Sequence, residues 1–301
     1  MSRVFIDGSA GTTGLRIRER LASRRDLELV VLSDELRKDV SARRDALNSA
    51  DVAFLCLPDA AAIEAASLVE NPDTVVIDTS TAHRTNDAWE YGFPELAGRR
   101  ERIAKAKRIA NPGCHASGFI ALVEPLVREG LVACDAKLSA FSLTGYSGGG
   151  KKMIAQYEAE RIMDGRQYAL GQTHKHLPEM VKVCGLKFAP CFSPVVVPHY
   201  SGMEVTVPLF DVDVDKIKAC YRDYYKSGLV RFADDPAAAE NGILSSAGLS
   251  GRDILEVSAY GNAERVVLVA RFDNLGKGAS GAVIQNMNIV LGVEETTGLV
   301  I

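Results

Sequence analysis

The chain has 301 residues, 47% of them hydrophobic, and a formal net charge of −4 at pH 7. This length allows one large domain or two of ordinary size. The slight negative charge argues against a nucleic-acid surface or an anionic membrane as partner, and no apolar run is long enough to span a bilayer. Six cysteines without a Cys-x-x-Cys pair indicate reduced thiols, and the first residues lead directly into a predicted strand rather than a signal peptide. We therefore expect a cytoplasmic enzyme.

The first predicted strand covers residues 3–7, and a glycine-rich turn and a helix to about residue 23 follow it. The turn has the spacing Gly-x-x-Gly-x-x-Gly, a variant of the dinucleotide-binding fingerprint. Its glycines permit a tight turn, close approach of a pyrophosphate and packing of the helix on the sheet, and the helix N-terminus faces the phosphates. The residues expected to bind the cofactor here are Gly8, Ser9, Gly11, Thr12, Thr13 and Gly14.

The second predicted strand, 27–32, ends in Ser33, where a cofactor without a 2′-phosphate would usually meet an acidic residue. A hydroxyl with the cations Arg37 and Lys38 nearby suits a 2′-phosphate better than a lone carboxylate would. The sequence therefore favours NADP(H), bound through Ser33 and Arg37. The alternative is an ordinary solvated face made of the cations Arg37, Lys38, Arg43 and Arg44.

Buried strands at 52–57 and 74–78, with a helix at 60–69 between them, extend the alternation of strands and helices. Such alternation predicts a Rossmann-like, doubly wound parallel sheet. Arg84 follows the strand at 74–78, at the sheet edge where ligands bind. It is therefore either a clamp for a substrate anion or a surface ion pair.

The pattern changes after residue 114, where strands become frequent and helices fewer. This indicates a second, α+β domain with a mixed or antiparallel sheet. A helix is expected at 215–227, and another closes the chain after residue 278. The expected strands are 137–144, 195–197, 204–209, 254–260 and 265–272.

Cys114 lies between a short apolar strand, 108–110, and a helix expected at 116–128, after the turn Asn-Pro-Gly. At the start of a helix, unpaired N–H groups and the helix dipole favour a thiolate. We therefore interpret Cys114 as a nucleophile. The alternative is a small buried hydrophobic residue, as most free cysteines are.

A cysteine nucleophile needs a proton-transfer partner, and the densest histidine cluster is His174-Lys175-His176-Leu177-Pro178-Glu179. In an extended segment, His174 and His176 would point to the same side. Pro178 suits the first turn of a following helix, and Glu179 can reach back to orient an imidazole. Metal binding by these side chains is the alternative, but no third strong ligand motif accompanies them and we predict no metal. Two ordinary surface histidines are the other alternative.

A glycine loop at 145–152 opens a helix expected to reach Met163. It lacks the spacing of a nucleotide phosphate loop, and Met153 stands where that motif needs a hydroxyl. Its backbone and cation remain candidates for holding a substrate anion. The residues singled out here are Ser147, Gly148 and Lys151.

Taken together in chain order, these motifs resemble N-acetyl-gamma-glutamyl-phosphate reductase, in particular its shorter bacterial group, which belongs with the aspartate-semialdehyde dehydrogenases. The resemblance covers nearly the whole chain. The motifs that carry it are Gly8-x-x-Gly11-x-Thr13-Gly14, Asn111-Pro112-Gly113-Cys114, Tyr146-Ser147-Gly148-Gly149-Gly150-Lys151, His174-x-His176-x-Pro178-Glu179 and Asp273-Asn274-Leu275-x-Lys277-Gly278-Ala279 with Gln285-Asn286.

The resemblance implies that residues 1–114, completed by a C-terminal helix within 278–301, bind NADP(H). Residues 115–277 would form the catalytic, substrate-binding and oligomerisation domain of a homodimer or homotetramer. Cys114 matches the family's nucleophile, and His176 is our first choice for the acid/base, supported by His174 and Glu179. The remaining residues matched to sites are Arg84, Ser147, Gly148 and Lys151 for substrate, and Gln285 and Asn286 beside the nicotinamide.

One departure is His115, where the family more often has an aromatic residue; it competes for the role of base, although a neighbour at a helix start usually points away from the nucleophile's pocket. The implied reaction is NADPH-dependent reduction of N-acetyl-L-glutamyl 5-phosphate through a cysteine thioester, in arginine biosynthesis. Aspartyl- or aminoadipyl-phosphate-type substrates remain open, because one methylene or an acetyl group is hard to resolve from sequence. A cysteine hydrolase and a non-catalytic NADP-binding sensor are the rival classes.

Overall fold

The computed structural model describes residues 1–9, 11–226 and 228–301, and of Thr12 only the backbone. The chain forms two compact units, which are described separately below. Unit 1 consists of Met1–Pro112 and Ala279–Leu299, and unit 2 of Gly113–Gly278 and Val300–Ile301.

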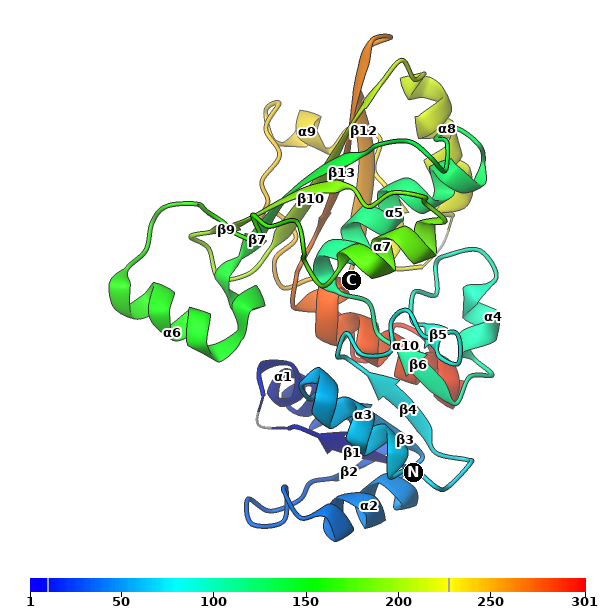
Figure 1. The fold of residues 1–301 in the computed structure, drawn as a ribbon, viewed down its shortest axis with the longest axis vertical. Coiled ribbons are helices and arrows are strands. Elements are labelled where there is room, and N and C mark those ends of the chain that lie inside the picture. Colours follow the sequence, from blue (N-terminus) through cyan, green and yellow to red (C-terminus); the bar gives the residue numbers. More distant parts are fainter. Residues whose placement is uncertain (10, 227) are drawn as a thin grey trace. The chain divides into compact units, whose positions relative to one another are not determined.

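Unit 1 is built on a six-stranded sheet whose strands all run parallel, in the order β2-β1-β3-β4-β6-β5 (Figure 1). The central strands are buried throughout, as expected for a sheet covered on both faces. The predicted doubly wound parallel sheet is therefore confirmed. The strands are β1 (Ser2–Asp7), β2 (Leu27–Val30), β3 (Val52–Leu55), β4 (Val75–Asp78), β5 (Glu90–Tyr91) and β6 (Arg108–Ala110).

Two apolar layers cover this sheet because successive side chains of a strand point to opposite faces. Val4 and Ile6 of β1 pack with Ile17 of α1 and Met287 of α10, whereas Phe5 packs with the other layer, which holds Leu47 of α2. The C-terminal helix therefore completes the core of unit 1. The helices are α1 (Thr12–Leu21), α2 (Val40–Ser49), α3 (Asp59–Ser67), α4 (Arg99–Ile103) and α10 (Gly281–Leu291).

The strand order of unit 1 reverses between β1 and β3. From β1 the chain moves outward to β2, then returns to place β3 on the other side of β1. In open parallel sheets the crevice outside the carboxyl ends at such a reversal is where ligands bind. The glycine turn after β1 lies at this reversal.

Unit 2 contains a seven-stranded mixed sheet in the order β11-β12-β13-β10-β7-β9-β8. The pairs β7–β9 and β11–β12 are parallel and the other neighbours are antiparallel. The predicted mixed sheet is confirmed. The strands are β7 (Ser139–Gly145), β8 (Arg166–Gln167), β9 (Cys191–Val197), β10 (Met203–Phe210), β11 (Val230–Phe232), β12 (Leu255–Gly261) and β13 (Arg265–Phe272).

The helix that carries Cys114, α5 (Cys114–Arg128), lies against this sheet. A Cβ on Gly118 would come within 2.5 Å of a methyl carbon of Val205 on β10, so only glycine permits this close approach. Pro125 inside α5 has no N–H to give to the carbonyl of Ala121, and the hydroxyl of Tyr225 donates to that carbonyl instead, at 2.8 Å. The helix is thereby held rigidly in place.

The remaining helical segments that the structure describes belong to unit 2, except that η2 runs across the boundary between the two units. Some expected boundaries were too long: the helix expected to reach Met163 ends at Glu160, because Arg161 has a left-handed backbone with φ of 50°. The helix expected at 215–227 ends at Tyr224, and Ser227 is outside the described residues. The segments are η1 (Tyr146–Gly149), α6 (Gly150–Glu160), α7 (Leu177–Cys184), α8 (Val214–Tyr224), α9 (Pro236–Ala239) and η2 (Gly276–Ser280).

Candidate active site

Cys114 is the first residue of α5. The residue before it, Gly113, is the N-cap, has an extended backbone and offers no side chain to the helix end. The first N–H groups of an α-helix have no partner within the helix and carry its positive dipole end. The half-buried thiol of Cys114 therefore lies where a thiolate and an oxyanion are both favoured.

Gly278 explains how the chain can pack tightly against this cysteine. A Cβ on Gly278 would lie 3.1 Å from the Cβ of Cys114 and 3.1 Å from the carbonyl oxygen of Asp273. Such contacts are tighter than ordinary van der Waals packing. A glycine at 278 therefore leaves room beside Cys114 within unit 2.

Glu179 has a contact that the sequence did not suggest. Its buried carboxylate accepts a hydrogen bond from the backbone N–H of Gly113, at 3.1 Å between nitrogen and oxygen. A carboxylate at this place caps α5 from outside the helix. Glu179 thus ties α7 to the turn that presents Cys114, besides any role in orienting an imidazole.

His174 and His176 do come together, but in a different backbone conformation from the expected extended one. The N–H of His176 donates to the Nδ1 of His174 at 3.1 Å, and the N–H of Leu177 donates to the carbonyl of His174 at 3.0 Å. His176 has a helical backbone and is the N-cap of α7, with Pro178 in the first turn as predicted. The two rings meet edge to face, 4.7 Å between centroids, because the segment is a turn and not a strand.

His115 does not point away from this cluster, contrary to expectation. Its ring lies 5.3 Å from the His174 ring and 5.6 Å from the His176 ring, centroid to centroid. Its Nδ1 is 2.8 Å from the hydroxyl of Ser142, and its Nε2 is 2.6 Å from the hydroxyl of Tyr168. Burial and the charge of His174 lower the pKa of His115 to about 3, so the imidazole is neutral. Because both ring nitrogens are already hydrogen-bonded, His115 is a poor general base.

This burial predicts a pH-dependent stability. In the unfolded chain a histidine has a pKa of about 6.5, so at pH values between the two pKa values the unfolded state binds a proton that the folded state does not. Stability is fully present above about pH 6.5 and decreases as the pH falls, by about 1.4 kcal/mol per pH unit for one such group. The free energy of unfolding, measured with denaturant between about pH 7 and pH 5, should fall more steeply with decreasing pH for the wild type than for the His115→Gln variant. Equal slopes for both proteins would show that His115 is protonated when folded.

Tyr168 is a residue that the sequence reasoning missed. Burial, and to a smaller extent the charge of Cys114, raise the pKa of its phenol above the usual value. It follows the two-residue strand β8, which is too short to show a pattern. The interaction of Tyr168 with His115 is visible only in the folded chain.

In unit 1, the glycine turn has the shape that a pyrophosphate requires. Gly8 has a φ of +88°, and a Cβ there would collide with the carbonyl oxygen of Cys56. A Cβ on Gly14 would collide with the carbonyl of Gly8 in the same turn, and Gly11 is the N-cap of α1 without a side-chain cap. These positions leave a bare backbone cradle at a helix N-terminus, so the residues present fit a dinucleotide phosphate. Thr13 is partly buried; the side chain of Thr12 is outside the described part of the chain.

A cavity of about 540 Å³ opens beside this turn, and both Gly8 and Ser9 line it. Arg37 and Lys38 also line it, whereas Ser33, the other residue expected beside a 2′-phosphate, is not part of the lining. The carbonyl of Ser33 instead accepts from the N–H of Arg37, at 3.0 Å, in the turn that carries this arginine.

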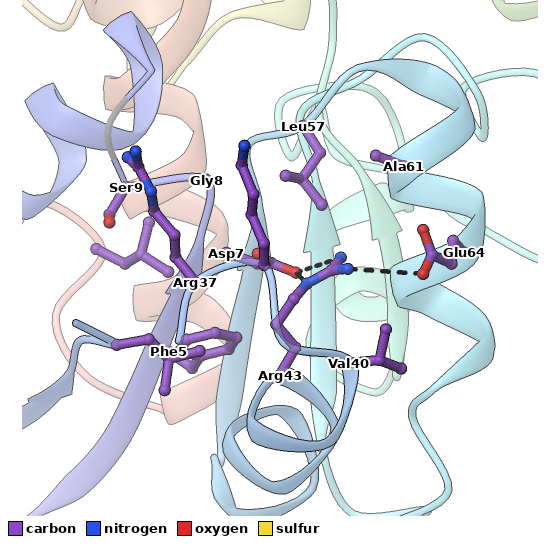
Figure 2. A pocket seen from close by; sticks show the side chains of 13 residues that line it. Phe5, Asp7, Gly8, Ser9, Arg37, Val40, Arg43, Leu57, Ala61 and Glu64 are labelled. Atoms are coloured by element: carbon purple, nitrogen blue, oxygen red, sulfur yellow. Dashed lines mark hydrogen bonds and ion pairs between the residues drawn. The ribbon is translucent and has the colours of Figure 1, made fainter. Parts of the chain in front are cut away.

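Arg43 also lines the cavity, and its placement corrects one interpretation of the sequence. It does not belong to a solvated face, since only 7% of it is exposed. Its guanidinium lies between the carboxylates of Asp7 and Glu64 (Figure 2). Neither Arg43 nor Asp7 was singled out as a cofactor-binding residue from the sequence.

The amide side chains of α10 are buried and point into unit 1. Gln285 donates to the carboxylates of Glu95, at 2.8 Å, and Glu295, at 2.7 Å. Asn286 donates to the carbonyl of Gly92 at 2.9 Å, while its Oδ1 is buried without a hydrogen-bond partner among the described residues. A buried acceptor of this kind fits an amide donor such as the nicotinamide carboxamide.

Arg84 is buried, and it binds the backbone. Its Nε donates to the carbonyl of Asn111 at 2.9 Å and one terminal nitrogen donates to the carbonyl of Thr79 at 3.0 Å. It therefore braces the Asn-Pro-Gly turn against the end of β4. An exposed surface ion pair, the alternative reading of Arg84, is excluded by this burial.

The glycine-loop residues differ in their accessibility. Ser147 is buried, its hydroxyl accepts from Asn274 at 3.0 Å, and its N–H donates to the carbonyl of Tyr200 at 3.0 Å. Gly148 and Lys151 are exposed. Of the three residues, Ser147 is thus engaged in holding the loop, whereas Gly148 and Lys151 are open to solvent.

Within residues 1–9, 11–226 and 228–301, no group of three or more His, Cys, Asp and Glu is arranged to hold a metal ion. Nor does any helix in those ranges have the length and apolar character needed to cross a membrane.

Comparison with known proteins agrees with this architecture in both units. Residues 3–106 match the NAD binding domain of semialdehyde dehydrogenases, and residues 114–274 match their dimerisation domain. Among solved structures, aspartate semialdehyde dehydrogenase II from Vibrio cholerae is similar in fold, with a TM-score of 0.73 at 16% identity over 97% of this chain and 99% of that one. The NADP complex of the Candida albicans aspartate semialdehyde dehydrogenase has a TM-score of 0.64 at 13% identity, over 97% and 99%. Fold and site together define an oxidoreductase of the semialdehyde dehydrogenase class, with a nicotinamide dinucleotide as cofactor.

Relatives in sequence identify the family more narrowly than the solved structures do. The chain is 41% identical to N-acetyl-gamma-glutamyl-phosphate reductase 2 of Nostoc sp., over 99% of both chains. It is 44% identical to N-acetyl-gamma-glutamyl-phosphate reductase of Brucella ovis, over 96% of this chain and 99% of the relative. The chain belongs to the N-acetyl-gamma-glutamyl-phosphate reductase family, and the family predicted from the sequence motifs is confirmed.

Proposed function

We propose that this protein reduces N-acetyl-L-glutamyl 5-phosphate to N-acetyl-L-glutamate 5-semialdehyde and phosphate with NADPH, as a step of arginine biosynthesis. The observation that carries the proposal is identity of 41% to 44% with reductases of that name over nearly the whole chain. The position of Cys114 at the start of α5 supports it, since the helix dipole there favours the thiolate that attacks an acyl phosphate.

In the first step, the thiolate of Cys114 attacks the acyl carbon of the substrate. The carbonyl oxygen becomes an oxyanion, and the positive end of the α5 dipole would stabilise it. The oxyanion then collapses, the bond from carbon to the phosphate oxygen breaks, and a thioester to Cys114 remains. A thioester accepts hydride, whereas a free carboxylate does not.

The cofactor is assigned to unit 1. When bound, NADPH supplies the hydride that reduces the thioester. The glycine turn from Gly8 to Gly14 would hold the pyrophosphate on its backbone, with Arg37 and Lys38 beside the 2′-phosphate. The unpartnered oxygen of Asn286 would accept from the carboxamide.

Reduction leaves a thiohemiacetal on Cys114, and His176 gives its oxygen a proton. When the imidazole takes that proton back, the bond from carbon to sulfur breaks, and the aldehyde departs as the thiolate of Cys114 is released. His115 is the weaker candidate because both of its ring nitrogens are occupied. His174 supports His176 through the hydrogen bond between them, and Glu179 positions the turn before Cys114. Arg84, Gly148 and Lys151 remain candidates for the substrate anions.

We assign cofactor binding and catalysis to two different domains of the chain. Residues 1–114 with 278–301 would form the NADP(H)-binding domain, and residues 115–277 the catalytic and substrate domain that also makes the oligomer contacts. A match to a dimerisation domain supports self-association, as a homodimer or homotetramer. A biosynthetic role of this kind suggests the cytoplasm as the location.

The test is a phosphate-dependent absorbance assay in the reverse direction, with NADP⁺ and either N-acetyl-glutamate semialdehyde or aspartate semialdehyde. We expect the acetylated substrate to be favoured by about 10²-fold or more in kcat/KM. Equal use or preference for aspartate semialdehyde would assign the chain a different acyl phosphate. Dinucleotide binding without turnover of any semialdehyde would favour a sensor, and hydrolysis without dinucleotide binding would favour a cysteine hydrolase.

A further inference from the structure

The cavity of unit 1 contains a buried charged group that the proposed reaction does not use. The Nε and one terminal nitrogen of Arg43 lie 3.1 and 2.9 Å from the same carboxylate oxygen of Asp7. The other terminal nitrogen lies 3.7 Å from Glu64. Figure 2 shows the guanidinium held between these two carboxylates. The group is held from two sides, by Asp7 and by Glu64.

Burying this ion pair costs desolvation free energy. The side chains of Arg43 and Asp7 are only 9% and 5% exposed. Burial raises the pKa of Asp7 above its ordinary value, although Arg43 acts in the opposite direction. Buried ion pairs add little stability compared with apolar residues of the same volume. Because stability does not explain the pair and both residues line a cavity large enough for a ligand, we expect the pair to contribute to ligand binding.

Arg43 lines the cavity while two carboxylates engage its N–H groups. Its N–H edges are directed at Asp7 and Glu64, which also neutralise its charge, so it is poorly suited to hold a phosphate. What Arg43 could still offer a ligand is the plane of its guanidinium, and apolar side chains line the same cavity, among them Val40 and Leu57. A flat guanidinium in apolar surroundings stacks well on an aromatic ring.

Unlike the buried Arg43, Arg37 and Lys38 are exposed to solvent. Arg37 is 48% exposed and forms an ion pair at 3.4 Å with Asp34, which is itself 86% exposed. Lys38 is exposed and lines the same cavity. Solvated cations at a cavity rim suit a phosphate, which arrives with its own charge.

We propose that Arg43, fixed by Asp7 and Glu64, is a positioning residue that stacks on the adenine ring of the dinucleotide, whereas Arg37 and Lys38 alone recognise the 2′-phosphate. Arg43 then contributes equally to the affinity for NADPH and NADH, and the discrimination between them comes from the rim. This assignment rests on the proposed function only for the identity of the cofactor.

The experiment measures dissociation constants for NADPH, NADH, 2′,5′-ADP and 5′-AMP by fluorescence or calorimetry, without any turnover. Arg43→Lys keeps a charge beside Asp7 but removes the planar face, and should weaken all four ligands by a similar factor of about tenfold. The double variant Arg37→Ala/Lys38→Ala should weaken NADPH and 2′,5′-ADP by about 10²-fold and leave NADH and 5′-AMP within about twofold. The matched control is Arg44→Lys on the same helix, because Arg44 pairs with Glu70 outside the cavity.

If Arg43→Lys does not fold, the double variant Asp7→Asn/Arg43→Gln removes both buried charges together and should give the same uniform loss. A loss confined to NADPH and 2′,5′-ADP in the Arg43 variants would make this residue a phosphate ligand and overturn the proposal. Unchanged affinity for all four ligands would also overturn it, leaving Arg43 a purely structural residue. Failure of the proposed function is a separate result: the wild type would bind dinucleotides normally but not turn over N-acetyl-glutamate semialdehyde.

Discussion

Replacing Cys114 with serine should abolish the reductase reaction, lowering kcat by about 10³-fold or more. A serine hydroxyl does not ionise near neutral pH, and the start of α5 cannot make it as nucleophilic as a thiolate. The measurement is phosphate-dependent NADPH formation from N-acetyl-glutamate semialdehyde. Mass spectrometry of the wild type with the acyl phosphate and no cofactor should also detect an acyl adduct on the peptide that carries Cys114.

The matched control is Cys191→Ser, because Cys191 is an exposed cysteine at the start of β9. This variant should keep full activity and the wild-type adduct. The affinity for NADPH should be unchanged in Cys114→Ser, which separates loss of chemistry from loss of binding. Near-normal turnover of Cys114→Ser would remove this residue as the nucleophile.

His176→Asn should lower kcat by about 10² to 10⁴-fold with little change in KM for the cofactor, because a general acid acts in the transition state rather than in binding. Asparagine keeps the hydrogen-bonding capacity and the approximate size of the side chain but cannot exchange a proton near neutral pH. The pH profile of kcat should lose the inflection that the imidazole contributes.

Two further variants decide which histidine acts. His174→Asn should cause a smaller loss, because its Nδ1 accepts from the backbone of His176 and an asparagine oxygen can partly replace it. His115→Asn should weaken the packing around Tyr168 without removing the pH inflection. Our choice of acid is wrong if His176→Asn retains most of its activity while either of the other variants does not.

The sequence by itself determined the class of fold, because the chemistry and periodicity that specify it are local. Glycines after a buried strand and alternation of apolar strands with helices predicted the parallel sheet of unit 1. Alternating strands predicted the mixed sheet of unit 2. The order of motifs was also sufficient to identify the family. Short elements such as β8 were missed, because two residues carry no period.

Tertiary structure decided which polar groups meet, since such contacts join residues far apart in the chain. Nothing local to His115 predicts its hydrogen bond to Tyr168, 53 positions away. Asp7 and Arg43 are 36 positions apart in the chain. They pair because the fold packs α2 beside the end of β1. Sequence patterns report the local backbone and the buried face of each element, whereas the partner of a buried charge is set by the packing of elements against one another.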